Sequence, residues 1–205
     1  MDSRENYNPD AAHGENERKV MQRTTTPHLF QPMSLRSVMA RNRIMVSPMC
    51  QYSATDGVAD DWHFQHLASR AVGGAGIVFT EVVHTEPRGR ITPYCLGLWN
   101  DEQRDALARI ARFVKAQGAV AGIQLGHAGR KGSTAAPWDG GKLVPAGTGG
   151  WQTIAPSALS FNDALSMPVA LDQDMLGETI KQFAASTRRA RDAGLSAPRV
   201  HLARP

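Results

Sequence analysis

The chain has 205 residues and is 41% hydrophobic, which suits one domain with a buried core. Its net charge is +4, and the basic excess gathers in residues 188–205 without interleaved aromatic side chains, so a nucleic-acid partner is not expected. No apolar stretch is long enough for a transmembrane helix or a secretory signal, so a membrane partner is not expected either. The two cysteines, Cys50 and Cys95, are too few for a disulfide framework and lack metal-ligand spacing, which favours a reducing, cytoplasmic compartment and no metal site.

Residues 1–26 form the first segment, and we expect them to be a disordered tail. They are polar and nearly free of large apolar side chains, so they cannot bury enough surface to offset the entropy of ordering. Order is expected to begin near Leu29 and Phe30. Residues 27–205 are then predicted to form one folded domain.

Strand-like and helix-like stretches alternate through that domain. Apolar, β-branched runs predict strands near residues 43–48, 76–82, 119–125 and 198–203. Apolar side chains at helical spacing, with capping residues before them and glycines after them, predict helices in residues 63–74, 100–118 and 172–194. A loop rich in Gly, Pro and Ser separates the third strand from the last helix, at about residues 128–170.

This alternation predicts an α/β fold with parallel strands and helices packed outside them. Two architectures compete, an open doubly wound sheet and a closed (β/α)8 barrel. An open nucleotide-binding sheet favours a G-x-G-x-x-G turn after its first strand, and that spacing is missing here. We therefore predict a TIM-barrel fold reduced to about the first four β/α units, with function at the carboxyl ends of the strands.

Three side chains near those strand ends could bind a polar ring system or a carbonyl group. Cys50 carries a polarizable thiol that is a weak donor, and Tyr52 could donate its phenol to a carbonyl oxygen. Strand-like alternation would place both side chains on one face. Gln124 lies inside an apolar run, where an unsatisfied carboxamide costs about 1–3 kcal/mol. The alternatives are a structural cysteine, an ordinary rim tyrosine and a glutamine satisfied within the core.

A further group of polar residues follows the third strand. His127, Arg130 and Lys131 look catalytic in isolation, in the run "GHAGRK". We interpret them mainly as parts of a structured loop at the mouth of the barrel.

The four strand-end motifs together resemble the Old Yellow Enzyme family of FMN-dependent ene reductases, in its thermophilic-like branch. The resemblance covers about residues 29–195, and the runs that carry it are "NRIMVSPMCQYS", "TEVVHTEPRGRIT", "GIQLGHAGRKG" and "MPVALDQDMLGETIKQFAASTRRARDAG". It implies an FMN cofactor, NADPH or NADH as hydride donor, and a small α,β-unsaturated carbonyl substrate whose C=C bond is reduced. Family members are often homo-oligomers.

The resemblance also implies roles for individual residues. Tyr52 and His201 would bind the substrate carbonyl and take part in catalysis. The residues that would line the flavin are Ser47, Pro48, Met49, Cys50, Val82 and Gln124. Position 82 is usually alanine in the family, so valine brings a bulkier side chain against the cofactor.

The last residues depart from the family pattern. His201 corresponds to the first histidine of the family motif His-x-x-His-Gly-Tyr, but Arg204 and Pro205 occupy the next two motif positions and the tyrosine position is not reached. Pro198 falls inside a predicted strand, where it removes a ladder hydrogen bond. We therefore expect a truncated or frameshifted gene product that is a very poor ene reductase. The alternative to an enzyme is a non-catalytic remnant, at most a weak flavin-binding or interaction protein.

Overall fold

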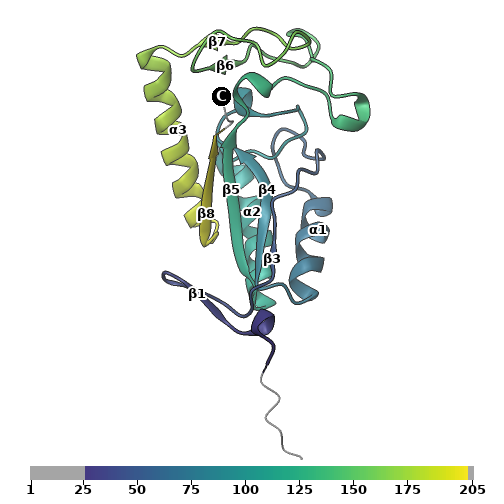
Figure 1. The fold of residues 1–205 in the computed structure, drawn as a ribbon, viewed down its shortest axis with the longest axis vertical. Helices are drawn as coiled ribbons and strands as arrows, with labels where there is room; N and C mark the ends of the chain where they lie inside the picture. Colours follow the sequence, from purple (N-terminus) through teal and green to yellow (C-terminus); the bar gives the residue numbers. More distant parts are fainter. Residues whose placement is uncertain (1–25, 203–205) are drawn as a thin grey trace, which may run out of the picture.

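The computed structural model describes residues 26–202, with side chains described through residue 196 (Figure 1). A four-stranded sheet lies at its centre, in the order β3-β4-β5-β8. Its strands are β3 (Met45–Val46), β4 (Ile77–His84), β5 (Val120–His127) and β8 (Ala197–Leu202). Every neighbouring pair in this sheet is parallel. Spatial order follows chain order, as in the first strands of a (β/α)8 barrel.

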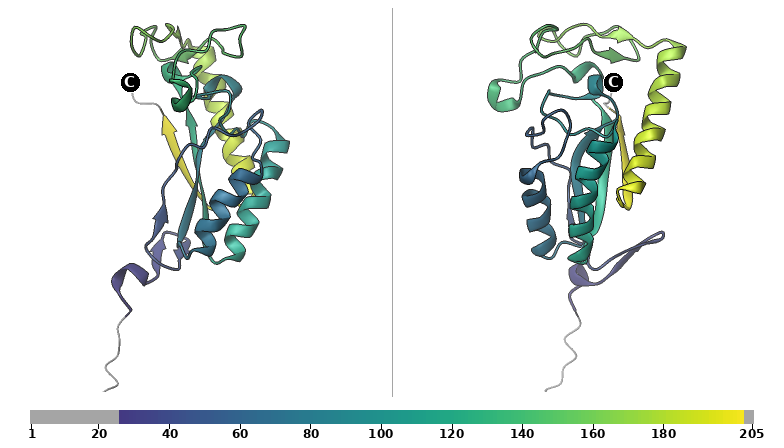
Figure 2. Two further views of the ribbon diagram at one scale, coloured as in Figure 1. Left: turned by 90° about the vertical axis from the view of Figure 1, so that its right-hand side faces the viewer. Right: turned by 180° about the vertical axis from the view of Figure 1, so that it is seen from behind.

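Three helices cover one face of this sheet (Figure 2). They are α1 (Asp61–Val72), α2 (Asp101–Ala116) and α3 (Gln173–Asp192). Asp60 and Asn100 begin the first two helices through capping boxes, and the Asp172 side chain accepts the Met175 backbone N–H at the start of α3. Each cap satisfies a backbone N–H that has no partner within the helix.

The core lies between the sheet and the helices. Alternate residues of β4 and β5 face the helices, where they pack against the apolar stripe of α2. The helix-facing residues are Val78, Val83, Ala121, Ile123 and Leu125. The opposite face carries Val82, Gly122 and Gln124, and no described helix covers it (Figure 2).

A bulge interrupts β4 between Phe79 and Val82, where the register with β5 shifts. A bulge adds a residue to one strand and re-aims the neighbouring side chains. Here it places Glu81 near α1 while Val82 stays in register with Gln124.

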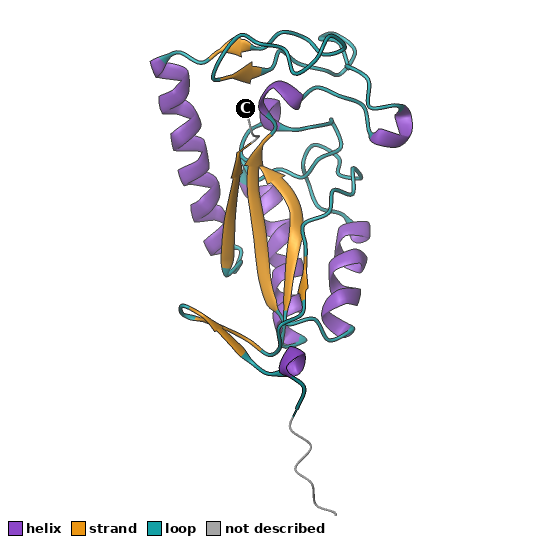
Figure 3. Cartoon of the chain, in the orientation of Figure 1, coloured by secondary structure: helices purple, strands orange, loops and turns teal. Residues whose placement is uncertain are grey.

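Short elements complete the fold (Figure 3). An antiparallel pair, β1 (Met33–Leu35) and β2 (Val38–Ala40), precedes the sheet, and a small parallel pair joins β6 (Ile154–Ala155) to β7 (Val169–Ala170). The 3-10 turns are η3 (His28–Phe30), η4 (Pro87–Gly89), η5 (Gly129–Lys131) and η6 (Pro137–Asp139). Neither pair was predicted, because strands of two or three residues carry no clear hydrophobic period.

The parallel α/β architecture and the order of its elements agree with the prediction, with boundaries shifted by a few residues. β8 forms although it contains Pro198, and it is an edge strand of the described sheet, where a missing donor is tolerated. The predicted tail, residues 1–26, lies outside the described residues except for Thr26. Among the described helices, none combines the length and apolar character needed to cross a membrane.

Candidate active site

The segment that leaves β3 brings Cys50 to the carboxyl end of β4. Its thiol interacts with the backbone of Val82 and with the Tyr52 side chain. Burial, and secondarily the negative charge of Glu81, raise the pKa of the Cys50 thiol to about 11. Cys50 is therefore a neutral thiol at pH 7 and not a nucleophilic thiolate.

Tyr52 reaches Cys50 by a different backbone path from the one we predicted. Its φ is +50°, in the left-handed region, and residues 47–53 are not a strand, so the alternation argument was wrong. The two side chains nevertheless interact, and burial and the neighbouring Cys50 raise the pKa of the Tyr52 phenol. On its other side, the Tyr52 ring meets Trp138 edge to face at 5.6 Å between centroids. Trp138 belongs to η6, in the long excursion after β5.

Val82 and Gln124 lie side by side on β4 and β5, in direct register. Both face away from the helices, and both are nearly buried. The Gln124 carboxamide makes no hydrogen bond to any other side chain or backbone group of residues 26–196. The alternative of a glutamine satisfied within the core therefore has no support among those residues.

The remaining predicted cofactor residues, Ser47, Pro48 and Met49, follow β3 directly. Ser47 and Met49 are exposed, and Pro48 is half-buried. Met49 is also tied to the segment, because its carbonyl accepts a hydrogen bond from the Gln51 amide at 2.8 Å. The structure thus gathers Cys50, Val82 and Gln124 at one end of the sheet, with the residues after β3 beside them.

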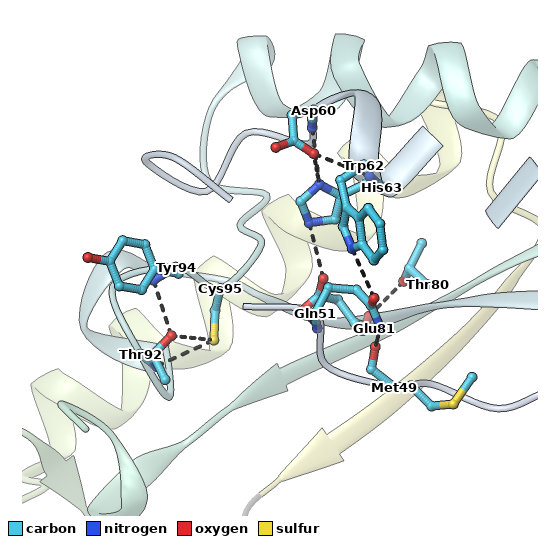
Figure 4. A network of polar contacts seen from close by, with 10 residues as sticks. All are labelled: Met49, Gln51, Asp60, Trp62, His63, Thr80, Glu81, Thr92, Tyr94 and Cys95. Atoms are coloured by element: carbon cyan, nitrogen blue, oxygen red, sulfur yellow. Dashed lines mark hydrogen bonds and ion pairs between the residues drawn. The ribbon is translucent and has the colours of Figure 1, made fainter. Parts of the chain in front are cut away.

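Sequence reasoning missed a buried polar network beneath this segment (Figure 4). Glu81 Oε2 accepts the Gln51 backbone N–H at 3.2 Å, and Glu81 Oε1 lies 3.2 Å from His63 Nε2. His63 Nδ1 contacts the Asp60 carboxylate at the start of α1. One signal was available in the sequence, since a lone glutamate inside the apolar run "GIVFTEVV" needs a buried partner.

Cys95, the other cysteine of the chain, lies close enough to Cys50 to affect its thiol but makes different contacts. It is fully buried, and its sulfur accepts the Thr92 backbone N–H at 3.4 Å. Burial raises the pKa of its thiol. These contacts describe a structural cysteine.

His127 forms a second buried pair at the neighbouring strand ends. Its Nδ1 accepts the Gly129 N–H, so Nε2 carries the proton that is donated to Glu86 Oε1 at 2.9 Å. Glu86 also accepts a hydrogen bond from Arg88 at 2.7 Å. These contacts fix the turn that follows β5, in agreement with a structural interpretation of His127.

Arg130 and Lys131 also contact the long loop. Arg130 donates to the Ser157 hydroxyl at 3.1 Å, and the Lys131 ammonium lies 4.3 Å from the centroid of the Phe161 ring. Both contacts hold the loop in place. Neither residue is part of the Cys50, Val82 and Gln124 group.

His201 is described by its backbone alone. Its strand position is in register with Gly126 on β5, so it lies at the same end of the sheet as Gln124. Arg204 and Pro205 lie outside the described residues. Within residues 26–196, no group of three or more His, Cys, Asp or Glu side chains is arranged to hold a metal ion.

Residues 28–204 match the model of the NADH:flavin oxidoreductase / NADH oxidase family. An NADPH dehydrogenase of Listeria monocytogenes is 40% identical over 177 residues, which cover 85% of this chain and 48% of that protein. An NADH:flavin oxidoreductase of Gibberella zeae is 39% identical over 179 residues, covering 85% and 43%. The chain thus spans about half the length of the curated relatives it matches.

Solved structures agree with the sequence relatives. Morphinone reductase superposes with a TM-score of 0.72 at 28% identity, over 86% of this chain and 48% of its own. The Old Yellow Enzyme homologue from Zymomonas mobilis superposes with a TM-score of 0.71 at 27% identity, over 85% and 48%. These matches confirm both the barrel fold class and the Old Yellow Enzyme resemblance. The chain belongs to the NADH:flavin oxidoreductase / NADH oxidase family.

Proposed function

We propose that this chain provides the ring-facing part of an FMN site in an oxidoreductase that uses NADPH or NADH to reduce the C=C bond of α,β-unsaturated carbonyl compounds. The observation that carries the proposal is that Val82 and Gln124 lie in register on the sheet face that no described helix covers, with the Cys50 thiol against the Val82 backbone. The names of the relatives, NADPH dehydrogenase and NADH:flavin oxidoreductase, support a nicotinamide donor.

The residues present fit a flavin. The Gln124 carboxamide has both donors and an acceptor without partners among residues 26–196, which suits the polar edge of a flavin ring. Val82 lies in register with Gln124, so its side chain would border the same part of the ring. The segment Ser47–Cys50 would border the ring from the β3 side.

When bound, FMN supplies the transfer of a hydride between the nicotinamide and the activated C=C bond. The chain's own residues would bind the flavin ring and polarise the substrate carbonyl. Gln124 would orient the ring by hydrogen bonds. Cys50, whose pKa is about 11, would stay a neutral, polarizable neighbour at pH 7. Tyr52 keeps its proton for the same reason of burial, so its phenol can donate to a substrate carbonyl oxygen. We assign His201 to the same oxygen.

Two free thiols, Cys50 and Cys95, support a reducing compartment, and we propose the cytoplasm. An enone is the substrate class that a phenol donor beside a flavin ring suits, because hydrogen bonding to its carbonyl draws electrons from the C=C bond.

The test is an FMN titration of the purified chain, followed by flavin fluorescence. We expect Gln124→Ala to weaken binding about tenfold, which corresponds to about 1.4 kcal/mol for the lost hydrogen bonds. Gln173→Ala, at an exposed position in α3, is the control and should bind as the unmodified chain does. Mixing the FMN-loaded chain anaerobically with NADPH should bleach the flavin absorption. Equal affinity in the Gln124 variant, or no bleaching, would overturn the proposal.

A further inference from the structure

Glu81 is a buried carboxylate that the proposed chemistry does not use directly. Its side chain is 1% exposed and lies at the bulge of β4. An isolated carboxylate in such a place is costly unless hydrogen bonds and a cation compensate it. Glu81 accepts one such hydrogen bond from the Gln51 backbone N–H, and its Oε1 lies 3.2 Å from His63 Nε2 (Figure 4).

His63 holds Glu81 from the start of α1. Its side chain is also 1% exposed, and its two ring nitrogens lie against Asp60 and Glu81. Burial opposes a positive charge on the ring, but the two carboxylates outweigh it and raise the pKa of His63. The imidazole that faces Glu81 is therefore fixed to a capped helix, and the carboxylate is held in one orientation.

The other end of the network is Gln51, the residue between Cys50 and Tyr52. Glu81 accepts its backbone N–H, and the Trp62 indole donates to its side-chain oxygen at 3.1 Å. Gln51 in turn donates to the Met49 carbonyl. β4 and α1 thus both form hydrogen bonds with Gln51, in the segment 47–53, which is not part of a strand.

We propose that Glu81 is a positioning residue, whose carboxylate fixes the Gln51 peptide and thereby sets where Cys50 and Tyr52 face the cofactor site. The placement of the segment stands on the contacts alone. Its consequence for FMN rests on the proposed function.

The experiment compares Glu81→Gln, which keeps an oxygen for the Gln51 N–H, with Glu81→Leu, which does not. Glu86→Leu is the matched control, since Glu86 is another buried carboxylate paired with a histidine, His127, but touches no part of the Cys50 segment. Hydrogen exchange of the peptide covering residues 47–54 is measured by mass spectrometry without cofactor. Exchange there should rise at least threefold in Glu81→Leu relative to Glu86→Leu, and should stay unchanged in Glu81→Gln.

Alkylation of Cys50 by iodoacetamide between pH 8 and 10 provides a second readout without FMN. The groups that face this thiol are Glu81, Tyr52 and Cys95, and Cys95 is fully buried. Removing the Glu81 charge in Glu81→Gln should raise the alkylation rate at a given pH about threefold, with no change in Glu86→Leu. A Cys50→Ala variant measures any background from Cys95.

Equal exchange of residues 47–54 in Glu81→Leu and Glu86→Leu would overturn the positioning role, whatever the alkylation rates. With both readouts as expected, Glu81→Leu should also bind FMN at least fivefold more weakly than Glu86→Leu, while Glu81→Gln should bind as the unmodified chain does. An unmodified chain that binds no FMN would refute the proposed function, and the two cofactor-free readouts would still decide whether Glu81 positions the segment.

Discussion

His84 is a histidine at the carboxyl end of β4 whose ring is fully buried. Neither ring nitrogen has a hydrogen-bond partner among residues 26–196. Burial, reinforced by the nearby His127, lowers the pKa of His84 to about 3. The unfolded chain takes up a proton on this residue near pH 6.5, whereas the folded chain does not. Folding stability is therefore lost as the pH falls below about 6.5.

We predict that the unmodified chain loses about 2 kcal/mol more than His84→Phe between pH 7 and pH 5, from about 1.4 kcal/mol per pH unit. Urea unfolding at both pH values measures the difference. The pKa values of Asp60 and Glu86 are lowered by their contacts with histidines, despite burial. These groups titrate in both proteins, so their contributions to the loss of stability cancel in the comparison. The same loss in both proteins would show that His84 is not the residue that titrates.

Arg41 ties the ends of two helices to the segment that enters the sheet. Its guanidinium donates to the carbonyls of Ala71 in the last turn of α1, Ala75 just after α1 and Gln117 just after α2, at 2.6 to 3.2 Å. The last carbonyls of a helix have no partner within it, so these contacts cap both helices with one side chain.

Arg41→Leu should lower the free energy of unfolding by about 2 kcal/mol, because three partly buried carbonyls lose a charged donor. Urea unfolding followed by far-UV circular dichroism checks the loss. Arg43→Leu, two residues further and exposed, should change stability by less than about 0.5 kcal/mol. If the two variants were equally destabilised, the capping role of Arg41 would be wrong.

Helix starts and strand types could be predicted because their signals are local. Asn100 followed by Gln103 marks α2, and β-branched runs mark β4. The pairing of Glu81 with His63 could not be predicted from the sequence, because it depends on a bulge in β4 and on how α1 packs. The prediction for Tyr52 assumed the alternation of side chains along a strand, and its left-handed backbone does not follow that alternation. Val82 and Gln124 lie side by side because β4 and β5 are parallel, as the strand order predicted, whereas their grouping with Cys50 was expected only from the family resemblance.

The described molecule is a parallel sheet with helices on one face and loops gathered at the carboxyl ends of the strands (Figure 2). β5 pairs on both sides, with β4 and β8, whereas β3 contributes only two paired residues. We predict that amides of β5 exchange most slowly with deuterated water, those of β3 faster, and those of the exposed stretch 140–150 fastest. Exchange mass spectrometry checks this order. Slower exchange in β3 than in β5 would contradict the described topology.

The backbone conformation of Tyr52 sets stability against function. A residue with a Cβ held at a φ of +50° costs about 1–2 kcal/mol relative to glycine, and asparagine tolerates this region better than tyrosine does. Glycine or asparagine at position 52 would relieve this strain, but would also delete the phenol beside Cys50 and the ring that meets Trp138. The backbone preference alone favours glycine or asparagine here, so tyrosine at this position across a lineage would record continued demand on the phenol, and a change to glycine or asparagine would mark the loss of that demand.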